Sequence, residues 1–356
     1  MMYALAGGGT GGHTYPSITV GEELRRRGNT LVYYGTERGP EHALAEAADI
    51  PFRGMAASQV RGGPRRMARG GWNLIRGTRD VASHMRVSHP AALFATGGYA
   101  AAPAGLAARR RAIPLLVFLP DVHPGWAVRF LNRFATTVAC SVDGALPSLP
   151  RRKTVVTGYP VRPQFHEATR DEGQRRFGLD PALPTLLVTG GSLGARAINR
   201  AIAAALPRLL QRAQILHICG RQEERWLLDE RSRLAPEMCA RYHLVAYTEQ
   251  MAWAMAAADL AVTRAGASTL GELPMAGLPA IVVPGEFSDQ RLNAAYLEQR
   301  GAAIELANDR LADLEPIITR LLDDDAERRR MAGAMLGLAR PEAAARLADL
   351  MEAMAA

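Results

Sequence analysis

Residues 7–13 read GGGTGGH, between the short apolar run YALA at 3–6 and a helical pattern at 15–27. Gly7, Gly9 and Gly12 satisfy the G-x-G-x-x-G fingerprint of dinucleotide-binding folds, and Glu37, after the next apolar run, is a candidate for its ribose-binding acid. The helix, however, starts at His-Thr-Tyr-Pro instead of the usual small residues, and the fingerprint alone has low specificity. The stretch therefore predicts a strand, a glycine turn and a helix whose exposed amides favour anionic or polar oxygens.

The same alternation of apolar runs and helical patterns continues along the 356 residues. The runs that predict buried parallel strands are YALA, TLVYYG, ALFATGG, PLLVFL and TVACS, then TLLVTGG, QILHICG, YHLVAY, LAVTRAG and PAIVVP. Helical patterns intervene at 15–27, 41–48, 101–111, 196–211 and 268–276. This order predicts an α/β protein with doubly wound sheets.

One coarse duplication organises the chain, because a second strand, glycine loop (GGSLGA) and helix occupy 186–205. Two Rossmann-like domains are therefore expected to face each other across a central cleft, one over 1–160 and one over 161–340. The Pro- and Arg-rich stretch at 146–165 is the expected joint. The helical tail is interrupted near Pro341, and a last helix at about 341–356 is expected to pack back on the first domain.

The composition is that of a folded protein with an anionic partner. Charged residues make up 22% and hydrophobic residues 48% of the chain, and the formal net charge is +8. An arginine-rich stretch at 61–86 contains Trp72, Leu74 and Ile75. It is either a solvated loop and helix or a patch for a membrane or a polyphosphate, and no motif for nucleic acid accompanies it.

The three cysteines (Cys140, Cys219 and Cys239) lie far apart without CxxC pairs, so neither a disulfide framework nor a zinc site is expected. The N-terminus has no signal-peptide pattern, and no apolar run approaches the roughly 20 residues that span a bilayer. Any membrane contact is therefore expected to be peripheral.

His13 is the candidate catalytic residue of the first glycine loop. A neutral imidazole at a helix start, beside the carboxyl ends of the strands, can take a proton from a hydroxyl nucleophile. The alternative is a histidine that caps the helix or orders the loop, and the residue taken alone favours that alternative.

Residues 190–196, GGSLGAR, predict a second loop suited to a diphosphate, through its amides, the Ser192 hydroxyl and Arg162 from the joint. Residues 264–272, RAGASTLGE, form a third constellation, in which Ser268 and Thr269 suit phosphate and Glu272 a ribose diol. Gln290 and Asn293 are spaced to share one helical face and could read sugar hydroxyls or an amide. Together these features favour a nucleotide-diphosphate-sugar site.

Metal chemistry finds little support. The string Asp323-Asp324-Asp325 lies in a helical tail and is typical of a helix start, and the histidines show no ligand spacing. No metal and no cofactor are expected, the nucleotide sugar being a substrate.

The motifs GGGTGGHTYP (7–16), ATGGYAAAPAGLAA (95–108), VTGYPVR (156–162), GGSLGARAIN (190–199), ADLAVTRAGASTLGELPMAGLPAIVVP (258–284) and DQRLNAA (289–295) follow one another as in a known family. Over essentially its whole length the chain resembles the N-acetylglucosaminyltransferases of glycosyltransferase family 28, which have the GT-B fold. The resemblance implies inverting, metal-independent transfer of N-acetylglucosamine from UDP-N-acetylglucosamine to undecaprenyl-diphospho-N-acetylmuramoyl-pentapeptide (lipid I). The product is lipid II for peptidoglycan, and hence for the cell wall, cell shape and cell division. It also implies a peripheral enzyme on the anionic cytoplasmic face of the bacterial inner membrane.

The resemblance also assigns site residues. Donor contacts are implied for Arg162, Ser192, Thr248, Ala267, Ser268, Thr269, Leu270, Glu272, Gln290 and Asn293. Contacts to the acceptor diphosphate are implied for Thr10, Gly11, Gly12, Gly97, Gly98 and Tyr99, with His13 or a residue near it as the base.

One stretch departs from the family pattern. Residues 118–125, FLPDVHPG, stand where the family has His-Glu-Gln-Asn before its Pro-Gly, so that Asp121 replaces a substrate-contacting asparagine. This departure suggests one alternative, the same donor with a different lipid or metabolite acceptor. Two others are open on separate grounds: a UDP-N-acetylglucosamine 2-epimerase, against which residues 96–99 (TGGY) and the basic apolar stretch argue, and a nucleotide-sugar-binding regulator.

Overall fold

The computed structural model describes residues 1–9, 11–58, 63–191, 194–285 and 290–355. The chain divides into two compact units, one of residues 1–162 with 340–356 and the other of residues 163–339. Arg162, which the sequence analysis assigned to the second domain, is grouped with the first unit.

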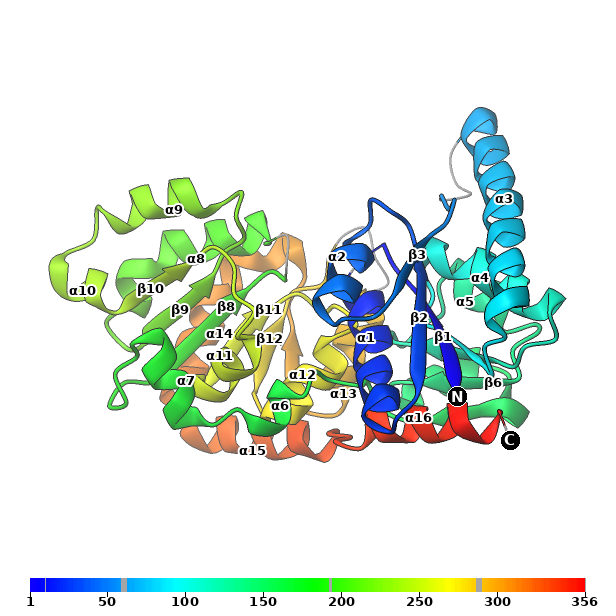
Figure 1. The fold of residues 1–356 in the computed structure, drawn as a ribbon. Helices are drawn as coiled ribbons and strands as arrows, with labels where there is room; N and C mark the ends of the chain where they lie inside the picture. The colour runs from blue at the N-terminus through cyan, green and yellow to red at the C-terminus, as the bar shows by residue number, and fades with distance from the viewer. Residues whose placement is uncertain (10, 59–62, 192–193, 286–289, 356) are drawn as a thin grey trace. The chain divides into compact units, whose positions relative to one another are not determined.

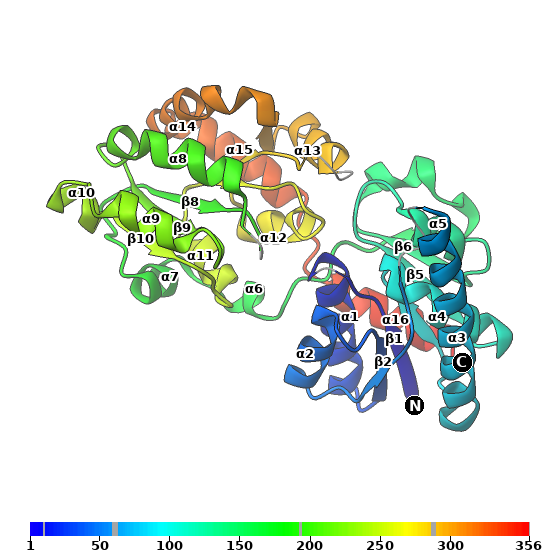
Figure 2. The ribbon, with the colours of Figure 1, turned by 90° about the horizontal axis from the view of Figure 1, so that it is seen from above.

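The first unit is built on a seven-stranded parallel sheet in the order β3-β2-β1-β4-β5-β6-β7. Its strands are β1 (Met2–Ala6), β2 (Thr30–Gly35), β3 (Phe52–Gly54), β4 (Leu93–Ala95), β5 (Leu115–Leu119), β6 (Thr137–Cys140) and β7 (Thr154–Val156). Helices α1 (Gly11–Arg26) and α2 (Pro40–Ala47) lie on one side of this sheet, and α3 (Pro64–Ser88), α4 (Gly98–Arg110) and α5 (Trp126–Leu131) lie on the other (Figures 1 and 2). The sheet is therefore doubly wound, as predicted.

Strand β1 shows why the sequence folds this way. Its residues are apolar throughout, because a central parallel strand is covered on both faces. Ala4 and Ala6 join the core cluster formed with α3 and α4, whereas Leu5 points to Gly21 of α1. The short apolar run YALA thus fills two cores at once.

The second unit has a six-stranded parallel sheet in the order β10-β9-β8-β11-β12-β13. Its strands are β8 (Thr185–Thr189), β9 (Gln214–Ile218), β10 (Tyr242–Val245), β11 (Leu260–Thr263), β12 (Ala280–Val282) and β13 (Ala303–Glu305). Helices α8 (Arg196–Leu209) and α14 (Leu314–Asp323) share one core with the sheet. Helices α7 (Arg170–Phe177) and α11 (Met251–Ala257) lie on the opposite side (Figure 2).

The remaining helices are shorter or surround these layers. They are α6 (Gln164–Glu167), α9 (Glu224–Arg231), α10 (Pro236–Ala240), α12 (Thr269–Ala276), α13 (Gln290–Gln299), α15 (Asp325–Gly337) and α16 (Ala343–Ala353). The ten predicted strands are confirmed. The sequence analysis missed β3, β7 and β13, which lie at the edges of the sheets and are mostly half-buried or exposed, so that no continuous apolar run marks them.

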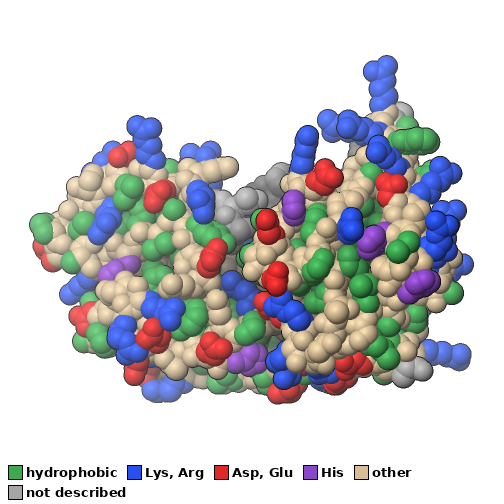
Figure 3. Space-filling view, in the orientation of Figure 1, with side chains coloured by type: hydrophobic (Ala, Val, Ile, Leu, Met, Phe, Trp, Pro, Cys, Tyr) green, Lys and Arg blue, Asp and Glu red, His purple; other side chains and the backbone are tan. Residues whose placement is uncertain are grey.

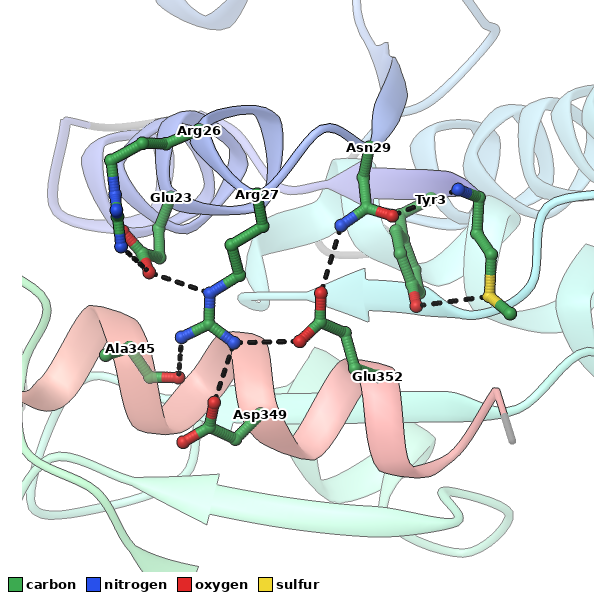
Figure 4. Close-up of polar contacts among 9 residues, drawn as sticks. Tyr3, Glu23, Arg26, Arg27, Asn29, Ala345, Asp349 and Glu352 are labelled. Atoms are coloured by element: carbon green, nitrogen blue, oxygen red, sulfur yellow. Dashed lines mark hydrogen bonds and ion pairs between the residues drawn. The ribbon is translucent and has the colours of Figure 1, made fainter.

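The last helix, α16, packs against α1 within the first unit. Arg27, just after α1, donates to Asp349 at 2.7 Å, to Glu352 at 2.8 Å and to the carbonyl oxygen of Ala345 at 3.2 Å (Figure 4). Asn29 adds a hydrogen bond to the other Glu352 oxygen at 3.0 Å. These contacts tie the end of the chain to its beginning.

None of the helices in the described part of the chain is long and apolar enough to cross a bilayer.

Candidate active site

In each sheet the chain first adds strands on one side of its first strand and then on the other side, which gives one switch point per sheet. The predicted loops lie at these switch points. In the first unit β1 pairs with both β2 and β4, so the loops after β1 and β4 leave the same edge on opposite sides. In the second unit β8 pairs with both β9 and β11, so the loops after β8 and β11 also leave the same edge on opposite sides. Such switch points at the carboxyl ends of parallel strands are where α/β proteins bind ligands.

At the first switch point His13 is held by the loop after β4. Its Nδ1 lies 2.8 Å from the carbonyl oxygen of Thr96, and the Thr96 hydroxyl donates in return to the His13 carbonyl oxygen at 2.5 Å. Ser17 Oγ contacts the same hydroxyl at 3.1 Å, and Thr96 is fully buried. Both the main chain and the side chain of Thr96 therefore form hydrogen bonds with His13.

This contact decides the tautomer of the imidazole. A carbonyl oxygen only accepts hydrogen bonds, so Nδ1 of His13 carries the proton. The lone pair of the neutral ring is then on Nε2, which is the nitrogen that can accept a proton from a substrate hydroxyl. The sequence left an ordering role and base catalysis open; the Thr96 contact shows that the ring orders the loop, and the role of Nε2 as the base stays a prediction.

The two glycine loops of the first unit are in direct contact. A Cβ on Gly98 would lie 2.2 Å from the carbonyl oxygen of Gly8, and Gly98 has a φ of +70°. A Cβ on Gly97 would lie 3.0 Å from a methyl group of Val128 and 3.5 Å from the His13 ring. The ring of Tyr99 lies against Gly9. Only glycine allows this close approach of the two backbones.

Arg162 and Tyr159 connect the joint to the same place. The Arg162 guanidinium stacks over the ring of Tyr15 in α1, with its carbon 4.9 Å from the ring centroid. The Tyr159 hydroxyl donates to the carbonyl oxygen of Gly12 at 3.4 Å. Arg162, a predicted donor residue, therefore lies against Tyr15, which is two residues after His13 in α1.

The departing stretch 118–125 begins in the last two residues of β5, the strand next to β4, and continues into the loop after it. Asp121 is partly exposed there. Arg129 donates to Nε2 of His123, and Nδ1 of that ring faces Ser148 Oγ at 3.4 Å. The loop therefore lies at the same sheet edge as residues 96–99 (TGGY), which follow β4, and His123 contacts Arg129 of α5 and Ser148.

At the second switch point the glycines pack against backbone. A Cβ on Gly190 would lie 2.1 Å from the Ala195 nitrogen, and one on Gly194 would lie 2.2 Å from the Cys219 carbonyl oxygen. Asn199 of α8 donates to that same carbonyl at 2.9 Å. The helix that follows the loop is thereby fixed to the end of β9.

A buried histidine completes this support. Nε2 of His217 donates to Oδ1 of Asn199 at 3.0 Å, and Nδ1 accepts from the Tyr242 hydroxyl at 2.8 Å. Burial lowers the pKa of His217 to about 3, so the ring is neutral and structural. Burial also raises the pKa of Tyr242 above its ordinary value.

The turn after β11 is braced by long side chains. Arg264 donates to the carbonyl oxygens of Val283 at 3.2 Å and Pro284 at 3.1 Å, and to Asn308 at 2.9 Å. Asn293, fully buried, donates to the carbonyl oxygen of Ala265 at 3.0 Å. Asn293 therefore supports the turn from within the protein, while the turn itself carries the residues expected to meet the donor.

The predicted donor residues begin or precede helices. Thr269 and the buried Leu270 start α12, which carries the partly exposed Glu272 in its first turn, and Ala267 and Ser268 precede the helix. Thr269 Oγ1 donates to the Gly266 carbonyl oxygen at 2.5 Å.

Two further donor candidates order turns. Thr248 Oγ1 accepts from the Gln250 nitrogen at 3.0 Å, just before α11. Gln290 opens α13 and accepts a hydrogen bond from the Gly285 nitrogen at 2.8 Å.

The structure gathers the acceptor candidates Gly11, Gly12, Gly97, Gly98, Tyr99 and Asp121 with His13 and Arg162 in the first unit, and the other described donor candidates in the second. Thr10 and Ser192, and Arg61 of the basic stretch, lie outside the described residues. In the described part of the chain no three His, Cys, Asp or Glu side chains are grouped to hold a metal ion.

Sequence reasoning missed two residues of the first site. Thr96 was noted only as part of a motif, and Glu41 was not considered, although it is fully buried against the glycine loop. Glu37, the candidate for a dinucleotide ribose, is exposed. Nothing in the sequence separates the two glutamates, which stand four residues apart in TERGPE.

Comparison with known proteins identifies the family. Sequence models of the glycosyltransferase family 28 N-terminal domain and C-terminal domain match residues 3–140 and 185–350. The chain belongs to glycosyltransferase family 28. A relative from Roseiflexus sp. (strain RS-1) is 41% identical and is covered over 94% of its length by 98% of this chain, and one from Thermus thermophilus is 39% identical with 99% of both covered. Both are named UDP-N-acetylglucosamine–N-acetylmuramyl-(pentapeptide) pyrophosphoryl-undecaprenol N-acetylglucosamine transferase.

Solved structures agree on the fold. The crystal structure of Acinetobacter baumannii MurG covers 99% of both chains with a TM-score of 0.78 and 26% identity. A UDP-GlcNAc 2-epimerase from Neisseria meningitidis covers 99% of both chains with a TM-score of 0.71, but at 12% identity this likeness shows the fold alone. The fold of this family 28 chain is that of the GT-B glycosyltransferases, as predicted.

Proposed function

We propose that the protein transfers N-acetylglucosamine from UDP-N-acetylglucosamine to lipid I and so forms lipid II for peptidoglycan. The observation that carries the proposal is the Thr96 carbonyl at 2.8 Å from Nδ1 of His13, which leaves Nε2 as the basic nitrogen at a switch point. Relatives 39–41% identical over nearly the whole chain are named as this transferase, which supports the choice of donor and acceptor.

In the proposed scheme each unit supplies part of the chemistry. Nε2 of His13 takes the proton of the acceptor hydroxyl as that oxygen attacks the anomeric carbon of the donor. The bond from that carbon to the diphosphate breaks, and UDP leaves from the opposite face, so the configuration inverts. The amides after β8, the turn before α12 and the Arg162 guanidinium stabilise the charge on the departing diphosphate.

We further propose that no metal or cofactor takes part. The leaving diphosphate needs compensating charge, and in this scheme helix N-termini at α8 and α12 and one arginine supply it. The expected consequence is that activity persists in excess chelator, and loss of activity in EDTA restored by magnesium or manganese would contradict it.

The membrane contact is assigned to α3. One face of α3 packs against α4, whereas the side chains of Met67, Trp72 (63% exposed) and Ile75 are exposed. The arginines of the described helix are Arg65, Arg66, Arg69, Arg76, Arg79 and Arg86, and Asp80 is its acidic residue. Figure 3 shows blue side chains gathered over this end of the first unit. Arginine next to exposed aromatic and aliphatic side chains suits the anionic cytoplasmic face of the inner membrane.

Transfer of label tests the reaction. The protein is incubated with labelled UDP-N-acetylglucosamine, with and without lipid I. Label in the lipid fraction that depends on lipid I supports the proposal. A new UDP-hexosamine formed without acceptor would instead indicate an epimerase, and UDP release only with another acceptor would indicate that the 118–125 departure has changed the acceptor.

Vesicle co-sedimentation tests the membrane surface. Arg69, Arg76 and Arg79 changed together to glutamine should weaken binding to anionic vesicles by about tenfold or more, since each basic residue near such a surface contributes about 1 kcal/mol. The matched control changes three exposed arginines of the second unit: Arg225, Arg233 and Arg320. Equal binding to neutral and anionic vesicles would contradict the assignment.

A further inference from the structure

A buried carboxylate under the first glycine loop has no part in the reaction as described. Glu41, in the first turn of α2, is 0% exposed. One oxygen accepts from the Thr36 nitrogen at 3.0 Å and from the Thr36 hydroxyl at 2.6 Å. The other accepts from the Gly9 nitrogen at 3.2 Å. All three partners are donors, which is what an acceptor-only carboxylate requires to be buried.

Three glycines leave the space that this carboxylate occupies. A Cβ on Gly8 would lie 2.4 Å from the carboxyl carbon of Glu41, and one on Gly39 would lie 2.2 Å from a carboxylate oxygen. A Cβ on Gly35 would lie 2.6 Å from its Cγ. The space for Glu41 is therefore built from the ends of β1 and β2 and the turn before α2.

The contact with Gly9 changes what the glycine loop can bind. The Gly9 amide is engaged with Glu41, so it is not a donor for a substrate oxygen in this arrangement. The buried negative charge also disfavours a phosphate group at that amide. An anionic substrate is thus directed away from residues 7–9 and toward the start of α1, where His13 lies.

Glu41 also reaches the catalytic residue through the backbone. Gly9 contacts Tyr99, and the adjacent Gly8 contacts Gly98, so fixing Gly9 fixes the contact between the two acceptor loops. Thr36, the second partner of Glu41, extends this link to the end of β2. No described contact joins Glu41 to His13 directly, and its action passes through the loop.

We propose that Glu41 is a positioning residue for the acceptor: it holds the loop at residues 7–9 in the shape that admits the acceptor diphosphate beside His13. This inference rests on the proposed function for the identity of the acceptor. Its role in holding the loop is independent of that identity.

The variant Glu41→Gln separates the two links of the carboxylate. Its amide oxygen can still accept from Thr36, but its NH2 group faces the Gly9 N–H, two donors in opposition. The matched control is Glu46→Gln, the same change at an exposed position of the same helix. Glu41→Asp, which keeps the charge and withdraws it by one methylene, serves if the glutamine variant does not fold.

Two measurements read the outcome. Steady-state kinetics with both substrates varied should show the acceptor KM of Glu41→Gln raised by about tenfold, as for loss of a supporting hydrogen bond, with the donor KM within twofold of the parent. Amide hydrogen exchange of the peptide that contains Gly9 should be faster in Glu41→Gln and unchanged in Glu46→Gln.

An unchanged acceptor KM in a folded Glu41→Gln or Glu41→Asp variant overturns the proposal, as does an equal rise in both KM values. If the parent protein transfers nothing to lipid I, the proposed function fails, and the hydrogen exchange of the loop still decides whether Glu41 holds it. Unchanged exchange in that case overturns the inference as well.

Discussion

The two switch-point loops share a sequence pattern but are stabilised by different means. The first contains His13 and is braced by polar side chains, namely the Glu41 carboxylate on the Gly9 amide and the Thr96 hydroxyl on the His13 carbonyl oxygen. The second packs Gly190 and Gly194 on backbone and is held through the amide of Asn199, and the neighbouring turn after β11 is held by the amide of Asn293. A carboxylate beneath the first loop and neutral amides behind the second suit an acceptor hydroxyl and a leaving diphosphate, respectively.

The largest effect is expected for His13→Ala, which removes the base from the first loop only. We expect kcat to fall by about 10²–10⁴-fold with the donor KM little changed, since general base catalysis contributes on that scale. His166→Ala, an exposed histidine of the second unit, is the control. A loss below fivefold would show that another group takes the proton.

Glu272→Gln tests the turn after β11 and the start of α12 in the same way. Loss of charge at the residue assigned to the ribose diol is expected to raise the donor KM by about 10–100-fold, as for hydrogen bonds to an ionised group, and to leave the acceptor KM unchanged. A raised donor KM in Glu272→Gln together with a raised acceptor KM in Glu41→Gln would establish that the two regions bind different substrates. A rise in the acceptor KM for both variants would contradict this.

Gly98→Ala against Gly266→Ala compares the packing of the loop after β4 with that of the turn after β11. The first places a Cβ 2.2 Å from the Gly8 carbonyl oxygen at a φ of +70°, whereas a Cβ on Gly266 meets nothing within 4 Å. We expect Gly98→Ala to destabilise the protein by about 1–3 kcal/mol and Gly266→Ala by less than about 0.5 kcal/mol, measured by denaturant unfolding. Equal stabilities would mean that the first loop yields without cost.

Acid should weaken the second unit through His217. Its pKa of about 3 in the folded state lies below the value of 6.5 it returns to on unfolding, so the unfolded chain binds the extra proton between these pH values. Stability then falls as pH falls, by about 1.4 kcal/mol per pH unit below 6.5, and the lowered pKa of His243 acts with the same sign. With Trp72 and Trp126 changed to phenylalanine, the fluorescence of Trp226 and Trp253 reports this unit alone, and an unchanged midpoint between pH 7 and pH 5 would contradict the expectation.

The smallest effect is expected for Thr96→Val. The Thr96 carbonyl still accepts from His13, but the hydroxyl contact with the His13 carbonyl is lost. We expect kcat to fall by about 3–10-fold, the cost of roughly one hydrogen bond, with Thr96→Ser close to the parent. A Thr96→Ser variant as slow as Thr96→Val would show that packing of the methyl group matters instead.

The sequence predicted the helices and strands that have a clear hydrophobic pattern, and missed the contacts between residues that lie far apart in the chain. Buried strands such as 185–189 stand out because both faces are covered. The function of Glu41 depends on Gly9, 32 residues away, and that of Thr96 on His13, 83 residues away. Neither pairing leaves a local pattern, so only the folded chain brings them together. Asn293 shows the converse, since its spacing from Gln290 suggested a shared ligand-facing side, yet it is buried on Ala265.

The chain order of the two units has a mechanical consequence. The second unit is a single insertion within the first, and its two connections leave the first unit at one place, where Gly158 lies against Arg340 and Ala343. Arg27 anchors the returning segment through α16. The units are therefore joined by two connections, and a single proteolytic nick in either one would cut the chain into two fragments that stay together through the non-covalent packing of α16 on α1.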